Sequence, residues 1–400
     1  MLVFADDLCL ISNHPADFQD LLDHQMNRLG LHLNPNKSFA FHMRGSTPVG
    51  TCDTSFLINN HRLHPVHEGE FHKFLGKPVG LNAVPNYSSL NDLAELGFKL
   101  ATSKLTPWQR LDALKALFYS SLQFPMRTAQ FPEGDWGEID KVILKEVKTT
   151  LNLPTEASNE YVYGQRKLGC CELPIAAEES DINLVDNTAF KLLSSRDEMC
   201  AKSAFASLQS TVHKRLGKLP DDPILSDYLS GNIGGDFSTT SNKFSNTWTA
   251  ARVASRGLGV QWIFDNSVPS LVFQDLTLKV NKRRKILFSI RDRLRNSRTT
   301  NLLRKKNQGK AIEVVSLAPT SSHFITDGTF TRFADWRFIH RARLKLVPEP
   351  VSTQDNLKNI LNHLFQADSP RRFCYQKMEM LTASVIGDQS PSATLHINFL

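Results

Sequence analysis

Short apolar runs separated by polar breaks predict two strands, a helix and a third strand in the first part of the chain. The runs at residues 2–5 and 8–12 are each short enough to be a buried strand, and the polar pair between them falls where a tight hairpin would turn. A helix is expected next, with Pro15 in its first turn and Gly30 at its end, followed by a strand over residues 38–43. This order of elements predicts an α+β fold, with a short antiparallel sheet and a helix in its first part.

Helical spacing begins near residue 90 and continues through much of the remaining chain. Leucines recur at helical intervals over residues 90–100, and a second helix is expected to start at Pro107 after a Thr106 cap and to stop at Pro125. Residues 216–245 are rich in Gly, Ser, Asn and Pro and are predicted to form a linker. The end of the chain has weak periodicity and is expected to be poorly ordered.

Size and composition allow two or three domains with hydrophobic cores, because the chain has 400 residues of which 41% are hydrophobic. Its six cysteines include no C-x-x-C pair, which favours reduced thiols over a disulfide framework. No apolar run approaches about 18 residues, so no membrane-spanning helix is predicted.

Positive charge is concentrated in one segment. The net charge of the chain is +7, but residues 279–310 contain thirteen Lys or Arg and a single acid, Asp292. Clustered cations release counterions from a polyanion, so this density favours a phosphate-binding surface over a solvated helix face. A nuclear-import signal in the run at residues 282–285 remains an alternative.

The polar pair of the first hairpin consists of two adjacent carboxylates, Asp6 and Asp7. Two like charges are costly to bury side by side unless a positive charge meets them, and a divalent cation bound with nucleic-acid phosphates is the usual solution. Neighbouring side chains of a hairpin point to opposite faces, so a two-metal site also needs a third carboxylate from another strand. Several histidines at residues 61–72 lack the ligand spacing of a closed zinc site, so exposed loop histidines are favoured there.

Three motifs of the N-terminal part resemble the palm of reverse transcriptases. F-A-D-D-L-C-L-I-S at residues 4–12 resembles the metal-binding hairpin, and G-L-H-L-N-P-N-K-S at residues 30–38 resembles the next palm motif. F-L-G at residues 74–76 resembles the primer-grip turn, which holds the primer 3′ end. Because these motifs occur in the family's order, the resemblance is more specific than any one of them.

The resemblance implies roles for six residues. Asp6 and Asp7 would bind catalytic Mg²⁺, and Lys37 would lie near the incoming nucleotide as a candidate general acid. The primer would be held by the turn residues Phe74, Leu75 and Gly76.

Later segments resemble parts of non-LTR, LINE-type retrotransposon reverse transcriptases. Residues 90–127 resemble the thumb that follows the template–primer duplex, and residues 168–174 resemble a glycine-rich turn after the thumb. Residues 333–344 resemble the region before the endonuclease in elements that insert into ribosomal DNA and carry a restriction-like nuclease. The implied partners are an RNA template and a DNA primer or target, and the implied location is the nucleus.

The cations predicted to contact nucleic acid are Lys104, Arg110, Lys115, Arg127, Lys282, Arg283, Arg284, Lys285, Arg291 and Arg295. The predicted domains are a partial polymerase palm at 1–88, mainly α-helical thumb helices at 89–152, a post-thumb helical segment at 153–215, the linker at 216–245, a basic helical nucleic-acid-binding region at 246–345 and a degenerate zinc-knuckle remnant at 346–400.

Departures from the family pattern shape the expected activity. In the family the fingers and the first palm strand, which carries the other catalytic aspartate, precede F-A-D-D, whereas three residues precede it here. Residues 357–363 resemble the tail of a C-C-H-C zinc knuckle, but Leu364 stands where a cysteine ligand would follow, so no zinc is predicted. We therefore expect an internal piece of a longer element that does not polymerise by itself. The alternatives are a nucleic-acid-binding remnant and a helical interaction protein without catalysis.

Overall fold

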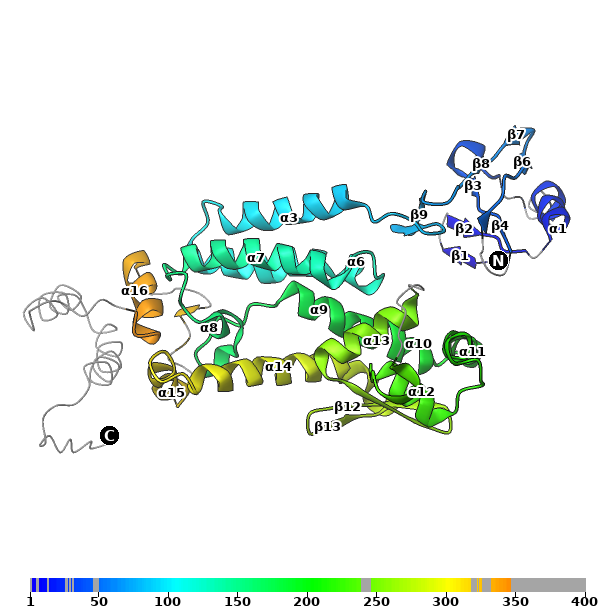
Figure 1. The fold of residues 1–400 in the computed structure, drawn as a ribbon. Coiled ribbons are helices and arrows are strands. Elements are labelled where there is room, and N and C mark those ends of the chain that lie inside the picture. The colour runs from blue at the N-terminus through cyan, green and yellow to red at the C-terminus, as the bar shows by residue number, and fades with distance from the viewer. Residues whose placement is uncertain are drawn as a thin grey trace, which may run out of the picture. The chain divides into compact units, whose positions relative to one another are not determined.

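The computed structural model describes residues 2–346 except residues 5, 6, 13, 26, 27, 29, 31, 46–49, 239–245, 318–321, 323 and 326–331. It divides the chain into two compact units, with the boundary between Asn91 and Asp92. Unit 1 is the part up to Asn91 and unit 2 is the part from Asp92 on (Figure 1). Helices and short sheets are mixed, which confirms the predicted α+β class. The predicted zinc-knuckle remnant lies, from residue 347 on, outside the described residues.

Unit 1 is built, in its described part, from short strand pairs and short helical elements. Its elements are β1 (Leu2–Phe4), β2 (Asp7–Cys9), α1 (Pro15–Asp20), the π-helical turn η1 (Leu21–Gln25), the 3₁₀ turn η2 (Pro35–Lys37), β3 (Phe39–Ala40), β4 (Met43–Arg44), β5 (Gly50–Thr51), β6 (Leu57–Ile58), β7 (His61–Arg62), β8 (His64–Pro65), β9 (His72–Phe74) and β10 (Lys77–Val79). Four pairs are antiparallel, namely β1–β2, β4–β5, β6–β7 and β9–β10. β3 and β8 pair in parallel, which differs from the expected antiparallel sheet. A parallel pair needs a long connection, and the intervening strands supply it.

Among the side chains that the structure describes, the core of unit 1 is small and joins elements between residues 10 and 63. Its buried members, with the half-buried side chains packed on them, are Leu22, Ala40, Ile58 and Leu63 with Leu10, Phe18, Leu33 and Phe56. The cluster therefore includes the end of the first hairpin, the helix and β3. Because little apolar area is buried here, we expect unit 1 to contribute only modestly to the stability of the chain.

Unit 2 is mainly helical. After α3 (Tyr87–Ala101), which crosses the unit boundary, its elements are α4 (Pro107–Ala113), η3 (Leu114–Phe118), α5 (Tyr119–Ser121), α6 (Gln123–Arg127), α7 (Glu133–Thr150), α8 (Asn159–Tyr163), η4 (Arg166–Leu168), α9 (Ala176–Asn183), η5 (Leu184–Phe190), α10 (Lys191–Leu193), α11 (Glu198–Leu216), α12 (Asp222–Leu229), η6 (Gly235–Phe237), α13 (Thr247–Leu258), β11 (Gln261–Asp265), β12 (Val268–Phe273), β13 (Leu276–Leu278), η7 (Val280–Lys285), α14 (Ile286–Leu303), α15 (Lys310–Ser316) and α16 (Phe333–Arg343). None of the helices in the described ranges is both long and apolar enough to cross a membrane.

α3, the helical run from α4 to α6, and α7 pack together at the start of unit 2 (Figure 1). Gly97 of α3 makes this possible, because a Cβ at this position would lie 2.7 Å from Cε2 of Phe118 and 2.8 Å from Cδ1 of Ile143. The helix start at Pro107 is confirmed. Pro125 does not stop the run as predicted, because it lies in the first turn of α6, where its missing N–H has no partner to lose.

Residues 216–245, predicted as a linker, form part of the core of unit 2 in their described part. They contain α12 and η6, which supply four buried side chains: Leu225, Tyr228, Leu229 and Phe237. The polar residues that suggested a linker instead begin a helix. Asp221 is the N-cap of α12 and accepts a hydrogen bond from the Ile224 N–H at 2.9 Å, while Pro223 lies in the first turn.

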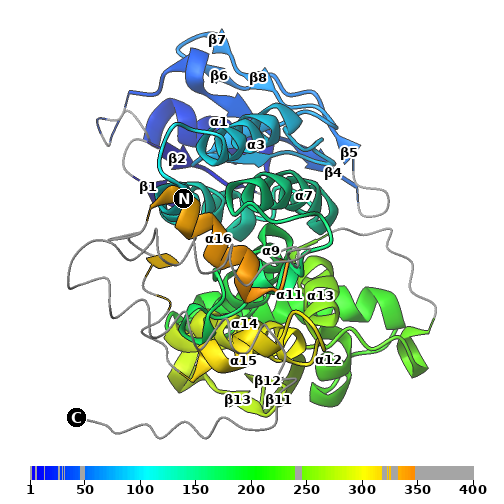
Figure 2. The same cartoon turned by 90° about the vertical axis from the view of Figure 1, so that its left-hand side faces the viewer.

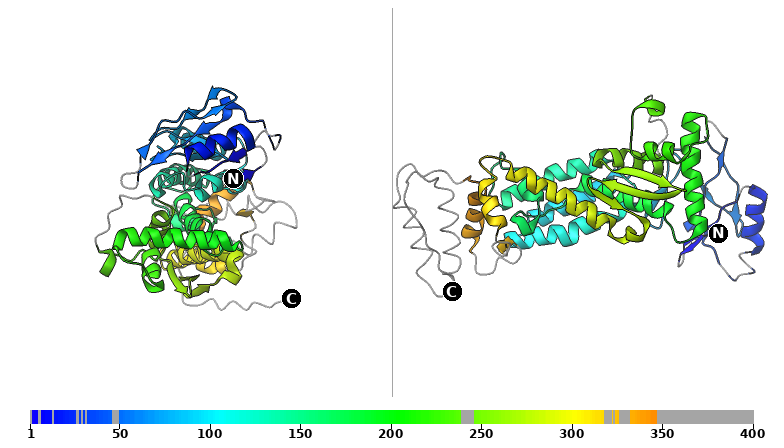
Figure 3. Two further views of the ribbon diagram at one scale, coloured as in Figure 1. Left: turned by 90° about the vertical axis from the view of Figure 1, so that its right-hand side faces the viewer. Right: turned by 90° about the horizontal axis from the view of Figure 1, so that it is seen from below.

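The region 246–345, predicted to be helical, also contains a three-stranded antiparallel sheet in the order β11–β12–β13 (Figure 3). Buried and exposed side chains alternate along β11, where Trp262 and Phe264 face the core. Asn266 and Ser267 connect β11 to β12 with φ values of 50° and 65°, as a two-residue primed turn requires. Alternation and turn are both visible in the sequence, and the surrounding helical pattern obscured them.

α12 protects the free edge of this sheet. Ser230 Oγ accepts a hydrogen bond from the Trp262 N–H at 2.8 Å, and Ser226 Oγ accepts one from the Phe264 N–H at 3.0 Å. The two serines are one helical turn apart, so one face of α12 satisfies backbone donors that a neighbouring strand would otherwise take.

Residues 161–173, which we call the central segment, run through the interior of unit 2. Most of its residues are buried, and its backbone is paired by side chains from distant elements. Lys115 of η3 donates to the Cys171 carbonyl at 2.6 Å, Thr299 of α14 accepts from the Gln165 N–H at 2.9 Å, and Arg343 of α16 donates to the Gly169 carbonyl at 2.8 Å. The segment thus holds three helices that are far apart in the sequence.

Gly169 of this segment is required by its conformation and its neighbours. Gly169 has φ +99°, and a Cβ there would lie 2.6 Å from Cγ1 of Val315 in α15. α15 in turn lies beside α14 and contacts α16 (Figure 2). The glycine-rich turn predicted at residues 168–174 is therefore a close-packing point between the middle and the end of unit 2.

We predict that Gly97→Ala destabilises the protein although alanine favours helices. The new methyl group would overlap Phe118 and Ile143, which costs about 1–3 kcal/mol and exceeds the helix-propensity gain of about 1 kcal/mol. Gly137→Ala in α7 is the matched control, because nothing lies within 4 Å of its Cβ position, and it should stabilise slightly. Urea unfolding checks both variants, and a stabilised Gly97→Ala would contradict the close packing.

Candidate functional site

The predicted first hairpin is present, but Asp7 belongs to its second strand instead of to its turn. β1 and β2 pair antiparallel with Phe4 opposite Asp7, so the connection between the strands is two residues long. Asp7 begins β2. Asp6 lies outside the described residues, and the side chain of Asp7 is likewise not described. The described backbone therefore places Asp7 next to the two-residue connection of a short hairpin.

Lys37 lies at the end of η2, directly before β3. Asn34 caps this turn, because its Oδ1 accepts a hydrogen bond from the Asn36 N–H at 3.0 Å. The Lys37 side chain is exposed. Leu33, just before the turn, and Leu10, just after β2, pack against the same core cluster, so the hairpin and the lysine turn are joined through a common core.

The predicted primer-grip residues form the tip of a second hairpin. β9 and β10 pair with Phe74 opposite Lys77, so Leu75 and Gly76 form a two-residue turn with φ values of 50° and 78°. This primed turn favours Asn or Gly at both positions, and leucine is unusual in the left-handed region because its Cβ is crowded there. Leu75 is also 41% exposed. A strained and exposed leucine at a hairpin tip indicates a contact surface rather than a folding requirement.

An aromatic contact connects the two predicted palm motifs. Phe39 of β3 stacks on His72 of β9, with ring centroids 3.6 Å apart and an interplanar angle of 25°. Phe39 lies two positions after Lys37, and His72 lies two positions before Phe74. The structure therefore brings the lysine turn and the primer-grip hairpin to the same part of unit 1, although they are far apart in the sequence.

The donor chemistry of this site suits magnesium only in part. Asp6 and Asp7 would offer carboxylate oxygens, which are the ligands that Mg²⁺ prefers. In the described part of the chain, however, no group of three His, Cys, Asp or Glu side chains is arranged to hold a metal ion.

Comparison with known proteins gives one partial similarity. No family model matches the chain. The chain is 27% identical over 178 residues to the retrovirus-related Pol polyprotein from the type-2 retrotransposable element R2DM of Drosophila melanogaster. The match covers 43% of this chain and 17% of that protein, so the chain spans only a small part of its relative. This similarity supports the predicted relationship to non-LTR retrotransposon reverse transcriptases.

The predicted thumb cations are used differently from one another. Lys115 donates to the Cys171 carbonyl, and burial lowers the pKa of its ammonium group, so it is a structural lysine. Arg110 donates to the Leu105 carbonyl at 3.0 Å, while Arg127 donates to Asn183 at 3.4 Å. Lys104 is exposed. Of these four, Lys104 retains the position expected of a phosphate contact.

The arginines of α14 form ion pairs within unit 2, which differs from their predicted role. Arg291 pairs with Glu179, and Arg295 pairs with Glu172 at 2.9 Å. A third pair, between Arg298 and Glu178, continues the same face of α14. The spacing i, i+4, i+7 places these arginines on one face of the helix, and that face packs against acidic residues near α9. We infer that Arg291 and Arg295 hold the fold together rather than contact phosphate.

The cations just before α14 remain at the surface. Lys282, Arg284 and Lys285 of η7 are exposed, and none has an ion-pair partner among the residues that the structure describes. Arg283 is the exception, because it is half-buried and donates to the Ser194 carbonyl at 2.7 Å. The basic segment therefore divides into structural arginines in α14 and a free cluster in η7.

A buried polar cluster that the sequence did not suggest joins α16 to the central segment. Tyr161 Oη and His340 Nδ1 share a hydrogen bond of 2.7 Å, and both side chains are fully buried. Burial raises the pKa of Tyr161 and lowers that of His340, so both are neutral. Burial also raises the pKa of Cys170 and of Cys171 to about 12, which excludes a thiolate nucleophile. The cluster is structural.

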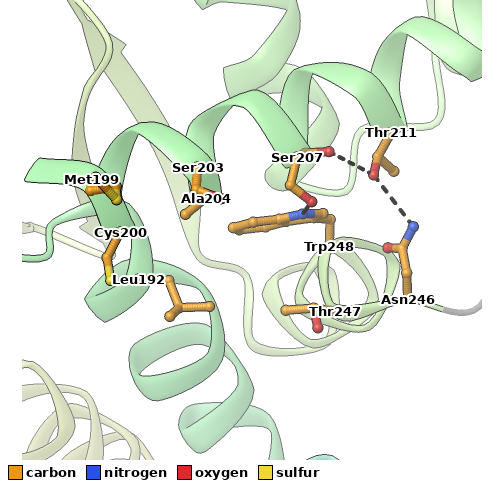
Figure 4. A pocket seen from close by; sticks show the side chains of 10 residues that line it. All are labelled: Leu192, Met199, Cys200, Ser203, Ala204, Ser207, Thr211, Asn246, Thr247 and Trp248. Carbon is orange, nitrogen blue, oxygen red and sulfur yellow. Dashed lines mark hydrogen bonds between the residues drawn. The ribbon is translucent and has the colours of Figure 1, made fainter. Parts of the chain in front are cut away.

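A surface pocket of unit 2 offers no acid–base chemistry among its lining residues. It has a volume of about 530 Å³ and lies between α11 and the start of α13 (Figure 4). Trp248 lines it, and its indole donates to Ser207 Oγ at 3.0 Å. Cys200 at its rim donates its thiol hydrogen to Asp197, which raises the pKa of the thiol and weakens it as a nucleophile.

The buried carboxylates Asp140 and Asp181 of unit 2 have raised pKa values. Asp140 of α7 accepts hydrogen bonds from the N–H groups of Ala176 and Ala177 at 2.7 and 2.9 Å, and so caps α9 from another helix. Burial raises its pKa to about 6 in spite of these bonds. Burial, with smaller contributions from nearby carboxylates, raises the pKa of Asp181 to about 8.

We predict that Arg291→Ala destabilises the protein by about 2 kcal/mol or more. Glu179 is 6% exposed, and removing its partner leaves a buried charge without compensation. The exposed Arg304→Ala should change the free energy of unfolding by less than about 0.5 kcal/mol. Chemical denaturation measures both. If both variants changed the free energy of unfolding equally little, Arg291 would not be structural, and its predicted contact with nucleic acid would stand.

We also predict that Asp181 makes the protein less stable as the pH rises from 7 to 8. Its folded pKa, about 8, lies above the ordinary value of 3.8, so the folded state binds the proton more tightly. The resulting stabilisation is complete below pH 3.8 and is lost as the pH rises through 8.

Asp181→Asn should reduce the fall in the free energy of unfolding between pH 7 and 8, by about 1 kcal/mol per pH unit at most. Denaturation of the wild type and the variant at pH 7, 7.5 and 8 measures the effect, with Asp92→Asn, an exposed carboxylate, as the control. Parallel pH profiles for wild type and Asp181→Asn would rule out a protonated Asp181.

Proposed function

We propose that the chain is part of a retrotransposon RNA-directed DNA polymerase, with unit 1 contributing palm elements and α3 to α7 contributing the thumb. The observation that carries this proposal is the arrangement around β3. The lysine turn precedes β3, the primer-grip hairpin stacks on it through Phe39 and His72, and the end of the first hairpin shares its core. The partial similarity to the R2DM Pol polyprotein supports the same reading.

Each palm element has a proposed task. Asp6 and Asp7 would hold Mg²⁺, which supplies charge stabilisation for phosphoryl transfer when bound. Lys37 would donate a proton to the leaving pyrophosphate, consistent with its exposed position. Phe74, Leu75 and Gly76 would support the primer end through the exposed tip of the β9–β10 hairpin.

The proposed partners are an RNA template and a DNA primer or target, and the proposed setting is the nucleus. The relative is the Pol polyprotein of a type-2 retrotransposable element, which supports a retrotransposon origin of the chain. The exposed cations Lys282, Arg284 and Lys285 also fit a nuclear-import signal.

A second candidate function is nucleic-acid binding without catalysis. The free cation cluster of η7 favours it, because three exposed cations without acidic partners suit a polyanion. Such binding would be independent of Asp6. Its affinity would fall steeply with salt concentration.

We predict that the 400-residue chain does not extend a primer by itself. Two metal ions need carboxylates from more than one strand, and Asp6 and Asp7 belong to a single hairpin. A primer-extension assay on a primed RNA template with Mg²⁺ and all four deoxynucleotides checks this, with Asp6→Ala and the exposed Asp17→Ala compared. Extension that Asp6→Ala abolishes and Asp17→Ala preserves would show that the chain already holds a complete site.

A further inference from the structure

An exposed aromatic side chain lies next to the free cations. Phe288, in the first turn of α14, is 71% exposed. Ile286 and Ile290 on either side of it are buried, and at about 100° per residue Phe288 lies on the opposite side of the helix from them. Phe288 therefore gains little from burial, and its aromatic face is accessible to a ligand.

The cations of η7 lie directly along the chain before this phenylalanine. In a 3₁₀ helix, residues three apart line up, so Lys282 and Lys285 share one side of η7. Lys285 and Arg284 are three and four positions before Phe288, the spacing that places side chains next to each other on a helix. Planar apolar surface and free positive charge thus occur together.

The acids that flank these cations in the sequence have other partners, and Asp275 pairs with Arg293 at 3.1 Å. Asp292, one helical turn after Phe288, accepts a hydrogen bond from Gln165 Nε2 at 2.9 Å. Glu179 is paired with Arg291. In the described part of the chain, the patch formed by Lys282, Arg284, Lys285 and Phe288 therefore keeps its positive charge.

We propose that this patch binds single-stranded nucleic acid, with a base stacked on Phe288 and phosphates bound by Lys282, Arg284 and Lys285. A polyanion that also exposes flat apolar faces is a single strand, because a duplex hides its base faces in the stack. The inference rests on the proposed function for the class of ligand, and it adds the strand type and a stacking residue. It does not depend on the palm site.

The test is binding of fluorescein-labelled oligo(U), oligo(dT) and a duplex, each about 20 nucleotides long, measured by anisotropy over a salt series. Phe288→Leu keeps apolar bulk and removes the aromatic face, so single-strand affinity should fall about tenfold with an unchanged salt slope. Duplex affinity should stay the same. Phe288→Trp should restore single-strand binding, and its fluorescence should be quenched by oligonucleotide.

Two further variants complete the design. The triple variant Lys282→Ala, Arg284→Ala, Lys285→Ala should reduce the salt slope for single strands by about 2. Phe333→Leu is the matched control, because Phe333 is also an exposed phenylalanine at a helix start and its neighbour Arg332 is paired with Asp335. Unchanged melting temperatures would establish that all variants fold.

The outcomes separate this inference from the proposed function. Stacking on Phe288 would be overturned if Phe288→Leu left single-strand affinity unchanged, or if it reduced duplex affinity equally. In that case a reduced salt slope in the triple variant would still support the contact between the cations and phosphate. If the true ligand were an acidic protein, no variant would change the affinity for any of the three oligonucleotides. This result would also overturn the inference. Primer extension is measured separately and reports on the palm alone. A preference for oligo(U) or oligo(dT) would identify RNA or DNA as the strand.

Discussion

The central segment imposes the main constraint on unit 2, because a buried backbone must have its polar groups paired. Residues 161–173 cannot meet this need within one regular element, and Lys115, Thr299 and Arg343 satisfy parts of it from three separate helices. Each of these side chains leaves an unpaired backbone group if it is lost. The requirement ties the helices before, within and after the basic segment into one unit, so the proposed thumb and the basic region do not form separate domains.

Charge is divided between folding and function along a single stretch of sequence. The arginines of α14 face the acids near α9 and neutralise them, as the Arg291–Glu179 pair shows. The cations of η7, a few residues earlier, have no such partners among the described residues. The same residue types therefore serve two purposes, and only the position of the acids in space separates them. Within η7, the exposed cations end where the inward face of α14 begins.

Unit 1 organises chemistry around a very small core. β3 is two residues long and pairs in parallel with β8. Its Phe39 stacks on the ring of His72, and its Ala40 is buried in the core of unit 1. A site arranged on so little buried surface is positioned by few contacts, so the proposed palm elements depend on their partners for rigidity. The left-handed conformation of Leu75 costs free energy, and the proposed contact with a primer gives a reason for it.

The sequence by itself determined the local features of the protein. The hairpin before Asp7, the turn at Gly76, the helix start at Pro107 and the α+β class follow from turn chemistry and periodicity, which act over a few residues. The sequence did not determine which cations are free, because Arg291 and Lys282 look alike until their distant neighbours are known. It also failed at α12, where capping residues resemble a linker until the buried side chains find a core. Only tertiary structure decided these points, since pairing and burial depend on residues that are remote in the chain.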